Sequence, residues 1–206
     1  MDRLHKLERL FTDFPGIGPR QAKRFAFFLL SKDSAYISNL ISLMSGLKQD
    51  IATCTLCFRF FPKNKTISKL CPTCSNASRN TPRLMVVARD IDFENIEKAD
   101  EYDGFYFLLG GVMPILEKDA ESRIRIKELI KRIEADGKIR KCKEIILAFN
   151  ANPEGENTTE FVRERISPLC KEYGIKISTL GRGLSTGLEL EYSDAETLKN
   201  ALKNRA

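Results

Sequence analysis

Apolar residues recur at helical spacing through the first fifty positions of the chain. The leucines and the phenylalanine of 4–11 would lie on one side of an amphipathic helix, and the run 14–19 interrupts it. A second helix is predicted to begin with Pro19 in its first turn, where proline is favoured, and a third covers about 34–50. These segments predict a small helical module over residues 1–52.

Beyond Pro82 the pattern changes to short apolar runs that alternate with helical segments. The expected buried strands are 84–88, 104–109, 144–149 and 175–178, and the helices between them lie near 93–99, 121–134 and 157–172. Strands that alternate with helices are typical of a parallel sheet with helices on both of its faces. We therefore predict an α/β fold, closed by a short extension with a strand at 188–192 and a helix from Asp194.

Between these two parts lies a segment that is rich in cysteine. It carries two Cys-x-x-Cys pairs separated by thirteen residues, formed by Cys54, Cys57, Cys71 and Cys74. Zinc prefers four tetrahedral ligands, and each pair places two thiolates on one tight turn. Disulfides are the poorer explanation in a cytosolic chain. We predict a four-cysteine zinc finger at 53–80, with one structural zinc ion per chain that replaces a core this short segment cannot build.

The interruption at 14–19 contains two glycines and joins two predicted helices. Glycine permits a left-handed backbone and close approach of a ligand. The amides of Gly16 and Gly18 would precede a helix N-terminus, whose partial positive charge favours phosphate. Three bases follow on neighbouring turns of that helix, namely Arg20, Lys23 and Arg24. We predict that this hairpin holds nucleic-acid phosphates without reading sequence; the alternative is an ordinary tight corner with solvated bases.

The charge distribution favours a polyanionic partner. The chain has a formal net charge of +6, and residues 1–80 hold 13 Lys and Arg against 5 Asp and Glu. This imbalance points to nucleic acid, although a solvated basic surface would give the same count. The single histidine, His5, excludes a two-histidine metal site and makes most hydrolase chemistry a poor hypothesis. No apolar run approaches the ~20 residues that span a bilayer, so we expect a cytoplasmic protein without a membrane partner.

The third predicted strand of the sheet ends in Asn-Ala-Asn-Pro-Glu-Gly-Glu at 150–156. This run resembles the Toprim motif of topoisomerases and primases, in which two aspartates precede Glu-Gly-Glu and help to hold magnesium for phosphoryl transfer. Asn150 and Asn152 stand at the aspartate positions, and Arg89 follows the first strand, where those enzymes carry a glutamate. Asp90 is the carboxylate that could replace part of the lost charge. We predict a Toprim fold with no catalytic residue, whose motif remnant is Asn150, Asn152, Glu154, Gly155 and Glu156.

The order of these parts resembles the RecR family of bacterial recombination mediators along nearly the whole chain. The resemblance rests on the Pro-Gly-Ile-Gly-Pro hairpin, the four-cysteine finger, the Toprim module and a Gly-Arg-Gly-Leu-x-x-Gly tail at 181–187. Further matches in family order are Glu-Tyr-x-Gly at 101–104, Leu-Gly-Gly at 109–111 and Glu-Gly-Glu at 154–156. The chain departs from the family in a longer interval between the cysteine pairs, in 112–119, and in Ser-Thr at 185–186.

The resemblance implies a DNA-binding protein of recombinational repair that is not an enzyme. Such a protein would form a ring or clamp, expected to be a tetramer, and would work with partner mediator proteins to load recombinase on single-stranded DNA. Arg20 and Arg24 match the family's DNA-contacting basic residues on the second hairpin helix. The predicted parts are a helix-hairpin-helix module at 1–52, a zinc finger at 53–80, a Toprim domain at 81–180 and an assembly extension at 181–206.

Two alternative functions belong to other classes. An active magnesium-dependent Toprim nuclease or primase-like enzyme would need a metal-binding carboxylate cluster, and Asn150 and Asn152 argue against it. A zinc-stabilised adaptor that never meets nucleic acid is disfavoured by the basic N-terminal part and by the hairpin.

Overall fold

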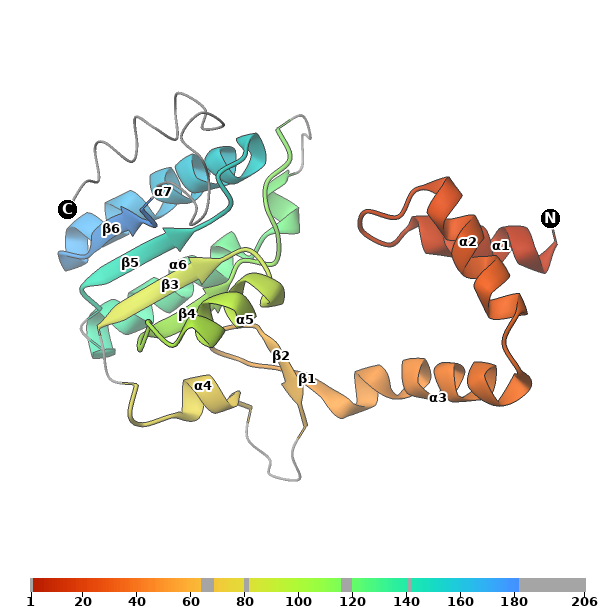
Figure 1. Ribbon diagram of the computed structural model, residues 1–206. Helices are drawn as coiled ribbons and strands as arrows, with labels where there is room; N and C mark the ends of the chain where they lie inside the picture. Colours follow the sequence, from red (N-terminus) through yellow and green to blue (C-terminus); the bar gives the residue numbers. More distant parts are fainter. Residues whose placement is uncertain (1, 64–68, 80–81, 116–119, 141, 182–206) are drawn as a thin grey trace, which may run out of the picture. The chain divides into compact units, whose positions relative to one another are not determined.

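The computed structural model describes residues 2–63, 69–79, 82–115, 120–140 and 142–181. The chain divides into two compact units, Met1–Ala52 and Thr53–Ala206. The helices of the first unit are α1 (Arg3–Thr12), α2 (Pro19–Leu30) and α3 (Ser34–Asp50) (Figure 1). The cysteine-rich segment contains β1 (Ile51–Thr53), β2 (Phe60–Pro62) and α4 (Pro72–Ser75). The sheet and its helices are β3 (Arg83–Val87), α5 (Asp90–Ala99), β4 (Phe105–Leu108), α6 (Ile126–Ala135), β5 (Glu144–Ala148), α7 (Pro153–Tyr173) and β6 (Lys176–Thr179).

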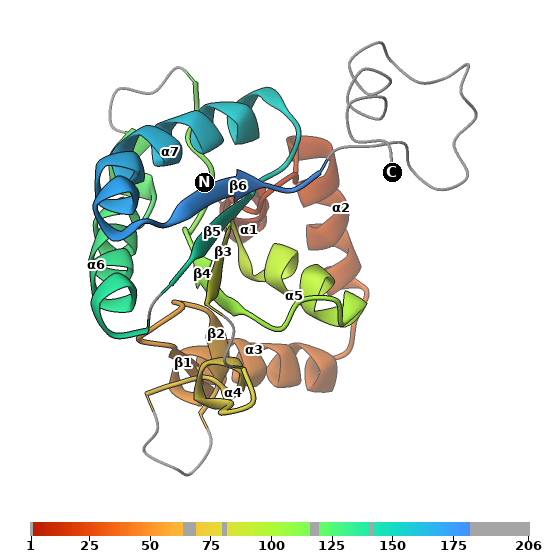
Figure 2. The same cartoon turned by 90° about the vertical axis from the view of Figure 1, so that its left-hand side faces the viewer.

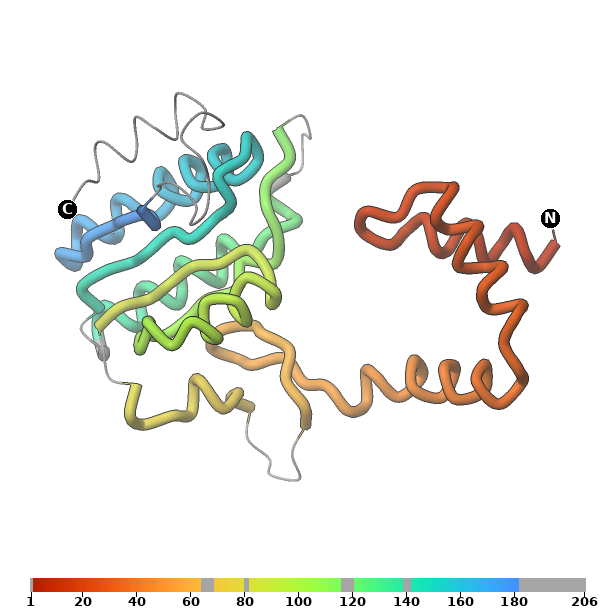
Figure 3. The backbone as a smooth tube through the Cα atoms, in the orientation of Figure 1, coloured from red at the N-terminus to blue at the C-terminus, as the bar shows by residue number. Residues whose placement is uncertain are grey.

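In the first unit, α1 and α2 form a helical hairpin whose reversal is visible in the backbone trace (Figure 3). Asp2 caps α1 by accepting a hydrogen bond from the His5 amide at 2.9 Å. Two fully buried alanines of α2, Ala22 and Ala26, form part of the hairpin core. Because alanine is small, the two helices can approach closely. Their close packing forms the core of this short module.

The predicted parallel sheet is confirmed. Its strand order is β4-β3-β5-β6, and every adjacent pair is parallel. Leu84 of β3 lies opposite Phe105 on one side and Ile145 on the other. Contiguous apolar runs form these strands because a parallel sheet of this kind is covered on both faces.

Helices cover both faces of the sheet, as predicted (Figures 1 and 2). Side chains alternate along β3, so that Leu84 and Val86 join the main core cluster with residues of α6 and α7. On the face covered by α5, the rings of Phe93 and Tyr106 meet edge to face with centroids 4.7 Å apart. The predicted α/β fold class is thus confirmed.

Several element boundaries differ from the sequence prediction. The last helix of the sheet domain begins at Pro153 rather than 157, because the Asn152 side chain caps it. The expected helix at 121–134 is divided into a 3-10 turn, Ala120–Arg123, and α6, which is followed by a π-helical turn, Asp136–Arg140. The short hairpin of β1 and β2 was not predicted, because three-residue strands carry no periodic pattern.

The predicted C-terminal extension falls almost entirely outside the described residues. Its strand at 188–192, its helix from Asp194 and all but the first residue of the tail motif lie in 182–206. Among the helices that the structure does describe, none has both the length and the apolar character needed to cross a membrane.

Candidate functional site

The turn between α1 and α2 presents backbone amides to solvent. Gly16 has a φ of +75°, a left-handed conformation that favours glycine, and the Ile17 amide donates to the Phe14 carbonyl at 3.0 Å. Gly18 is the N-cap of α2 and has no side chain to bond the first-turn amides. A Cβ atom on Gly18 would meet nothing within 4 Å, so the space around it is open. This helix N-terminus can therefore accept an anion such as phosphate.

The predicted DNA-binding bases lie exposed on the same helix as this N-terminus. They are Arg20, Lys23 and Arg24. No acidic residue occurs within α2 to neutralise them, and the Arg24 guanidinium donates only a long hydrogen bond, at 3.4 Å, to the amide oxygen of Gln21. A polyanion bound at the N-terminus of α2 would meet these cations within its first two turns.

The four predicted metal ligands come together in one buried cluster. The Sγ atoms of Cys54, Cys57, Cys71 and Cys74 all lie within 4.8 Å of one another. The Sγ atoms of Cys57 and Cys71 are 3.6 Å apart. Four sulfurs at about 2.3 Å from a tetrahedral zinc ion would lie about 3.8 Å apart, whereas a disulfide requires about 2.05 Å. The cluster can hold a metal ion and its ligand chemistry is consistent with zinc.

Backbone amides and mutual contacts tune the sulfurs of this cluster. The Cys71 amide points at Cys54 Sγ at 3.4 Å, and the Cys74 amide points at Cys71 Sγ at 3.5 Å. Hydrogen bonding with Cys57 lowers the pKa of the Cys54 thiol, whereas hydrogen bonding with Cys54 raises the pKa of Cys74. Because adjacent thiolates repel one another, all four sulfurs can be ionised together only beside a cation.

The first cysteine turn is attached to the edge of the parallel sheet. The Leu108 amide of β4 donates to the Cys57 carbonyl at 2.8 Å. From α6, Arg132 donates to the Leu56 carbonyl at 2.9 Å, and its Nε lies 2.6 Å from the carboxylate of Asp136. Both side chains of this ion pair are buried. The cysteine segment and the sheet are therefore joined by polar contacts that are buried or partly buried.

The Toprim motif remnant lies at the end of the sheet where the carboxyl ends of the parallel strands meet. β3 and β5 are adjacent and parallel, so Arg89 after β3 and Asn150 after β5 come to the same edge. The side-chain oxygen of Asn152 accepts a hydrogen bond from the Gly155 amide at 2.8 Å. A Cβ atom on Gly155 would lie 1.9 Å from the Asn150 carbonyl, so only glycine fits there. Three residues of the remnant thus shape the start of α7.

The carboxylates at this end of the sheet lie at a helix N-terminus or accept a backbone hydrogen bond. Glu154 and Glu156 are exposed in the first turn of α7, where the helix dipole favours negative charge. Asp90 accepts a hydrogen bond from the Phe60 amide of β2 at 2.9 Å and so connects the cysteine segment to α5. Within the described ranges, the cysteines form the only group of three or more His, Cys, Asp and Glu side chains that could hold a metal.

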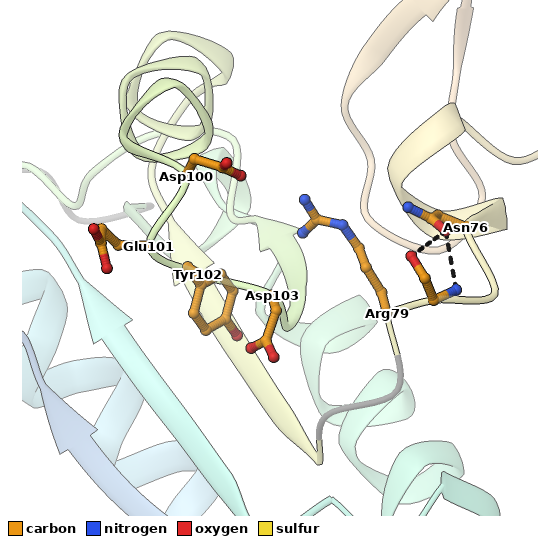
Figure 4. Close-up of a pocket in the computed structure, with 7 residues that line it drawn as sticks. Asn76, Arg79, Asp100, Glu101, Tyr102 and Asp103 are labelled. Carbon is orange, nitrogen blue, oxygen red and sulfur yellow. Dashed lines mark hydrogen bonds between the residues drawn. The ribbon is translucent and has the colours of Figure 1, made fainter.

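A polar pocket of about 430 Å³ lies between the cysteine segment and the loop before β4 (Figure 4). Its lining residues are Asn76, Ser78, Arg79, Asp100, Glu101, Tyr102 and Asp103. Of these, Arg79 donates to the Gly104 carbonyl at 2.8 Å and pairs with Glu97. A Cβ atom on Gly104 would lie 2.3 Å from the Tyr102 hydroxyl. The Glu-Tyr-x-Gly stretch at 101–104 therefore serves close packing in this region.

Two groups of residues were missed in the sequence. Phe27 and Phe28 are exposed on α2, and no role was predicted for them from the sequence. Their position four residues after Lys23 and Arg24 was the available signal, since that spacing shares a helix face. Arg132 and Asp136 were also overlooked; an oppositely charged pair four residues apart in an otherwise apolar helix face could have indicated them.

The chain is similar to known protein families and to named proteins. A family profile described as "Toprim domain" matches residues 83–181, and one described as "RecR, C-terminal" matches residues 183–206. Three similar curated proteins are named "Recombination protein RecR". The protein from Lactobacillus acidophilus is 35% identical over 195 residues, which cover 95% of this chain and 92% of that protein. Those from Dehalococcoides mccartyi and Bifidobacterium longum subsp. infantis are 36% and 34% identical over 202 residues, which cover 98% of this chain and 93% and 94% of those proteins.

Proposed function

The chain belongs to the RecR family of recombination proteins, and we propose that it is a non-enzymatic DNA-binding mediator. Family membership supports a role in recombinational DNA repair. In the proposed mechanism the protein acts in the cytoplasm as a ring-like homo-oligomer, expected to be a tetramer. It works with other mediator proteins of the pathway to load recombinase on single-stranded DNA.

The hairpin of the first unit carries the DNA-binding part of this proposal. Gly16 and Gly18 leave the N-terminus of α2 open, and three cations follow on that helix, which contains no acidic residue. Amides and basic side chains contact the phosphodiester backbone, which is the same for every sequence. Binding is therefore independent of sequence, as a mediator that acts anywhere in a genome requires.

The chemistry of the sheet edge supports a protein without phosphodiester activity. Asn150 and Asn152 are neutral, and the latter is engaged as a helix cap. Asp90 is bonded to a backbone amide, and Arg89 brings positive charge to the edge. Magnesium binds through carboxylates that offset the cost of its partial dehydration. With amides at 150 and 152, this end of the sheet lacks the aspartate pair with which the Toprim motif holds the ion.

We assign the four-cysteine cluster one structural zinc ion per chain. The sulfurs of Cys54, Cys57, Cys71 and Cys74 supply all four tetrahedral positions. No position is then left for water or substrate, so the metal would hold the fold and take no part in a reaction. Thiolate ligands, rather than carboxylates, favour zinc over magnesium or calcium.

Substitution of two hairpin arginines tests the proposed DNA contact. In Arg20→Ala combined with Arg24→Ala, the slope of log affinity against log salt should become shallower by about two on duplex DNA, if each arginine neutralises one phosphate. Affinity should fall to a similar extent for two duplexes of unrelated sequence. The measurement is fluorescence anisotropy of labelled duplexes over a range of salt concentrations.

A matched control removes two arginines from another helix. Arg163 and Arg165 of α7 pair with Glu160 and Glu121, so their replacement by alanine should leave the salt slope unchanged. Circular dichroism verifies that each variant is folded. An unchanged slope and affinity in the hairpin variant would mean that the hairpin is an ordinary helix corner and that DNA is held elsewhere.

A further inference from the structure

The face of α2 that carries the three cations also carries two exposed aromatic rings. Phe27 is 49% exposed and Phe28 is 47% exposed. Together with the cations they line one shallow hollow, whose residues are Arg20, Lys23, Arg24, Phe27 and Phe28. The intervals of three, one, three and one residues place all five on one side of the helix. We call these five residues the α2 stripe.

The rings of the stripe lie away from the core between α1 and α2, and the Phe28 ring meets the Tyr36 ring of α3 edge to face with centroids 6.2 Å apart. The core side of α2 is formed by Ala22 and Ala26, and by Phe25, whose ring meets Phe11 at a centroid distance of 5.8 Å. In an ideal helix that side lies opposite the α2 stripe. Large apolar side chains gain free energy from burial, so adjacent exposed rings bordered by cations mark a binding surface.

The surroundings of the rings are cationic. Lys23 Nζ lies 5.9 Å from the centre of the Phe27 ring, and Lys32 Nζ lies 4.5 Å from that of Phe28. A ligand with flat apolar faces and regularly spaced negative charges matches such a surface. Single-stranded DNA has both features, whereas the base faces of a duplex are hidden in the stack.

We propose that Phe27 and Phe28 stack on unpaired bases while the cations of the α2 stripe hold the adjacent phosphates. This inference rests on the proposed DNA-binding function and adds a preference for single strands over duplex DNA.

A second copy of the chain is a less suitable occupant for this surface. A symmetric contact between two stripes would bring their cations together, and α2 carries no acidic residue to compensate them.

A double substitution that removes the two rings but keeps large apolar side chains tests the proposal. Phe27→Leu combined with Phe28→Leu should weaken binding of a single-stranded oligothymidine by roughly 5- to 150-fold for each stacked base that is lost. Binding of a duplex of equal length should change less than about twofold. The salt slope should stay constant on both substrates, since no phosphate contact is removed. The matched variant with tyrosine at both positions keeps aromatic rings and should bind single strands as the wild type does.

A spectroscopic variant reports stacking directly. The chain contains no tryptophan, so Phe27→Trp introduces a single reporter into the α2 stripe. Its fluorescence should be quenched by oligothymidine much more strongly than by duplex at equal saturation, because only an unpaired base can stack on the indole. Equal quenching by both substrates would overturn the proposal.

The outcomes separate this inference from the proposed function. If the Arg20 and Arg24 variant loses affinity while the leucine variant binds both DNA forms normally, the hairpin binds DNA and the stacking proposal fails. If the leucine variant loses both substrates equally and light scattering shows a smaller assembly, the face is a contact between chains, and stacking is again excluded. If neither variant changes binding, the hairpin does not hold DNA, and both the proposed hairpin contact and the stacking proposal fail.

Discussion

Replacement of Cys71 by serine is expected to remove the bound metal and to unfold the cysteine segment together with the sheet edge on which it packs. A serine hydroxyl does not ionise near neutral pH, so a tetrahedral site would lose one of its four ligands. Metal binding supplies about 10–16 kcal/mol to isolated zinc-finger peptides, which is comparable to the ~5–15 kcal/mol that stabilise a whole domain. Cys71 also caps α4 through its sulfur, so its loss removes a local contact as well.

Metal analysis and hydrogen exchange measure this effect. The wild type should contain one zinc ion per chain, and the serine variant should contain little or none. Exchange of the Leu108 amide should accelerate, since that amide bonds to the Cys57 carbonyl. Cys170→Ala is the control. This cysteine is buried in the core of the sheet domain, so its replacement should not change the metal content. Full stability of the wild type after verified removal of its metal would contradict the expectation.

Arg132→Ala is expected to lower the free energy of unfolding of the Thr53–Ala206 unit by about 3–5 kcal/mol. Arg132 is 6% exposed and lies 2.6 Å from the buried carboxylate of Asp136. The truncation removes a buried ion pair with Asp136 and the donor to the Leu56 carbonyl, and alanine replaces neither contact. Urea unfolding followed by circular dichroism measures the change.

An exposed ion pair provides the comparison for this large effect. Arg163 lies 3.9 Å from Glu160 on α7, and Arg163→Ala should cost less than about 1 kcal/mol, because solvent screens the pair. The Arg132 variant should also bind its metal more weakly, since Leu56 lies in the first cysteine turn. If both variants lose the same small free energy of unfolding, the Arg132 contact does not join the cysteine segment to the sheet.

Local patterns were sufficient to locate most of the fold. The third helix was predicted at 34–50 and is observed at Ser34–Asp50, and the first sheet strand was predicted at 84–88 and is observed at Arg83–Val87. Helical periodicity and continuous burial on both faces leave strong signals in neighbouring residues. The start of α7 was missed, because the asparagines before it were interpreted as replaced metal ligands and not as a helix cap.

The candidate sites were predictable only where their residues lie close in sequence. The cysteine pairs are recognisable by their spacing, and the hairpin bases follow two glycines. The contact from Phe60 to Asp90 joins positions 30 apart, and the contact from Arg132 to Leu56 joins positions 76 apart. No local pattern carries such long-range pairs, because they depend on how the cysteine segment packs on the completed sheet.

Binding DNA and cutting DNA can be separated most directly in a single experiment on the purified wild-type chain. A labelled duplex and a supercoiled plasmid are incubated with the protein at matched ionic strength, with and without magnesium. Asn150 and Asn152 stand at the carboxyl end of the sheet, where the Toprim motif has its metal-binding aspartates. The protein should therefore bind the duplex without magnesium and leave the plasmid intact when magnesium is present. Nicking of the plasmid that requires magnesium and disappears in Glu154→Gln would contradict a mediator without catalysis.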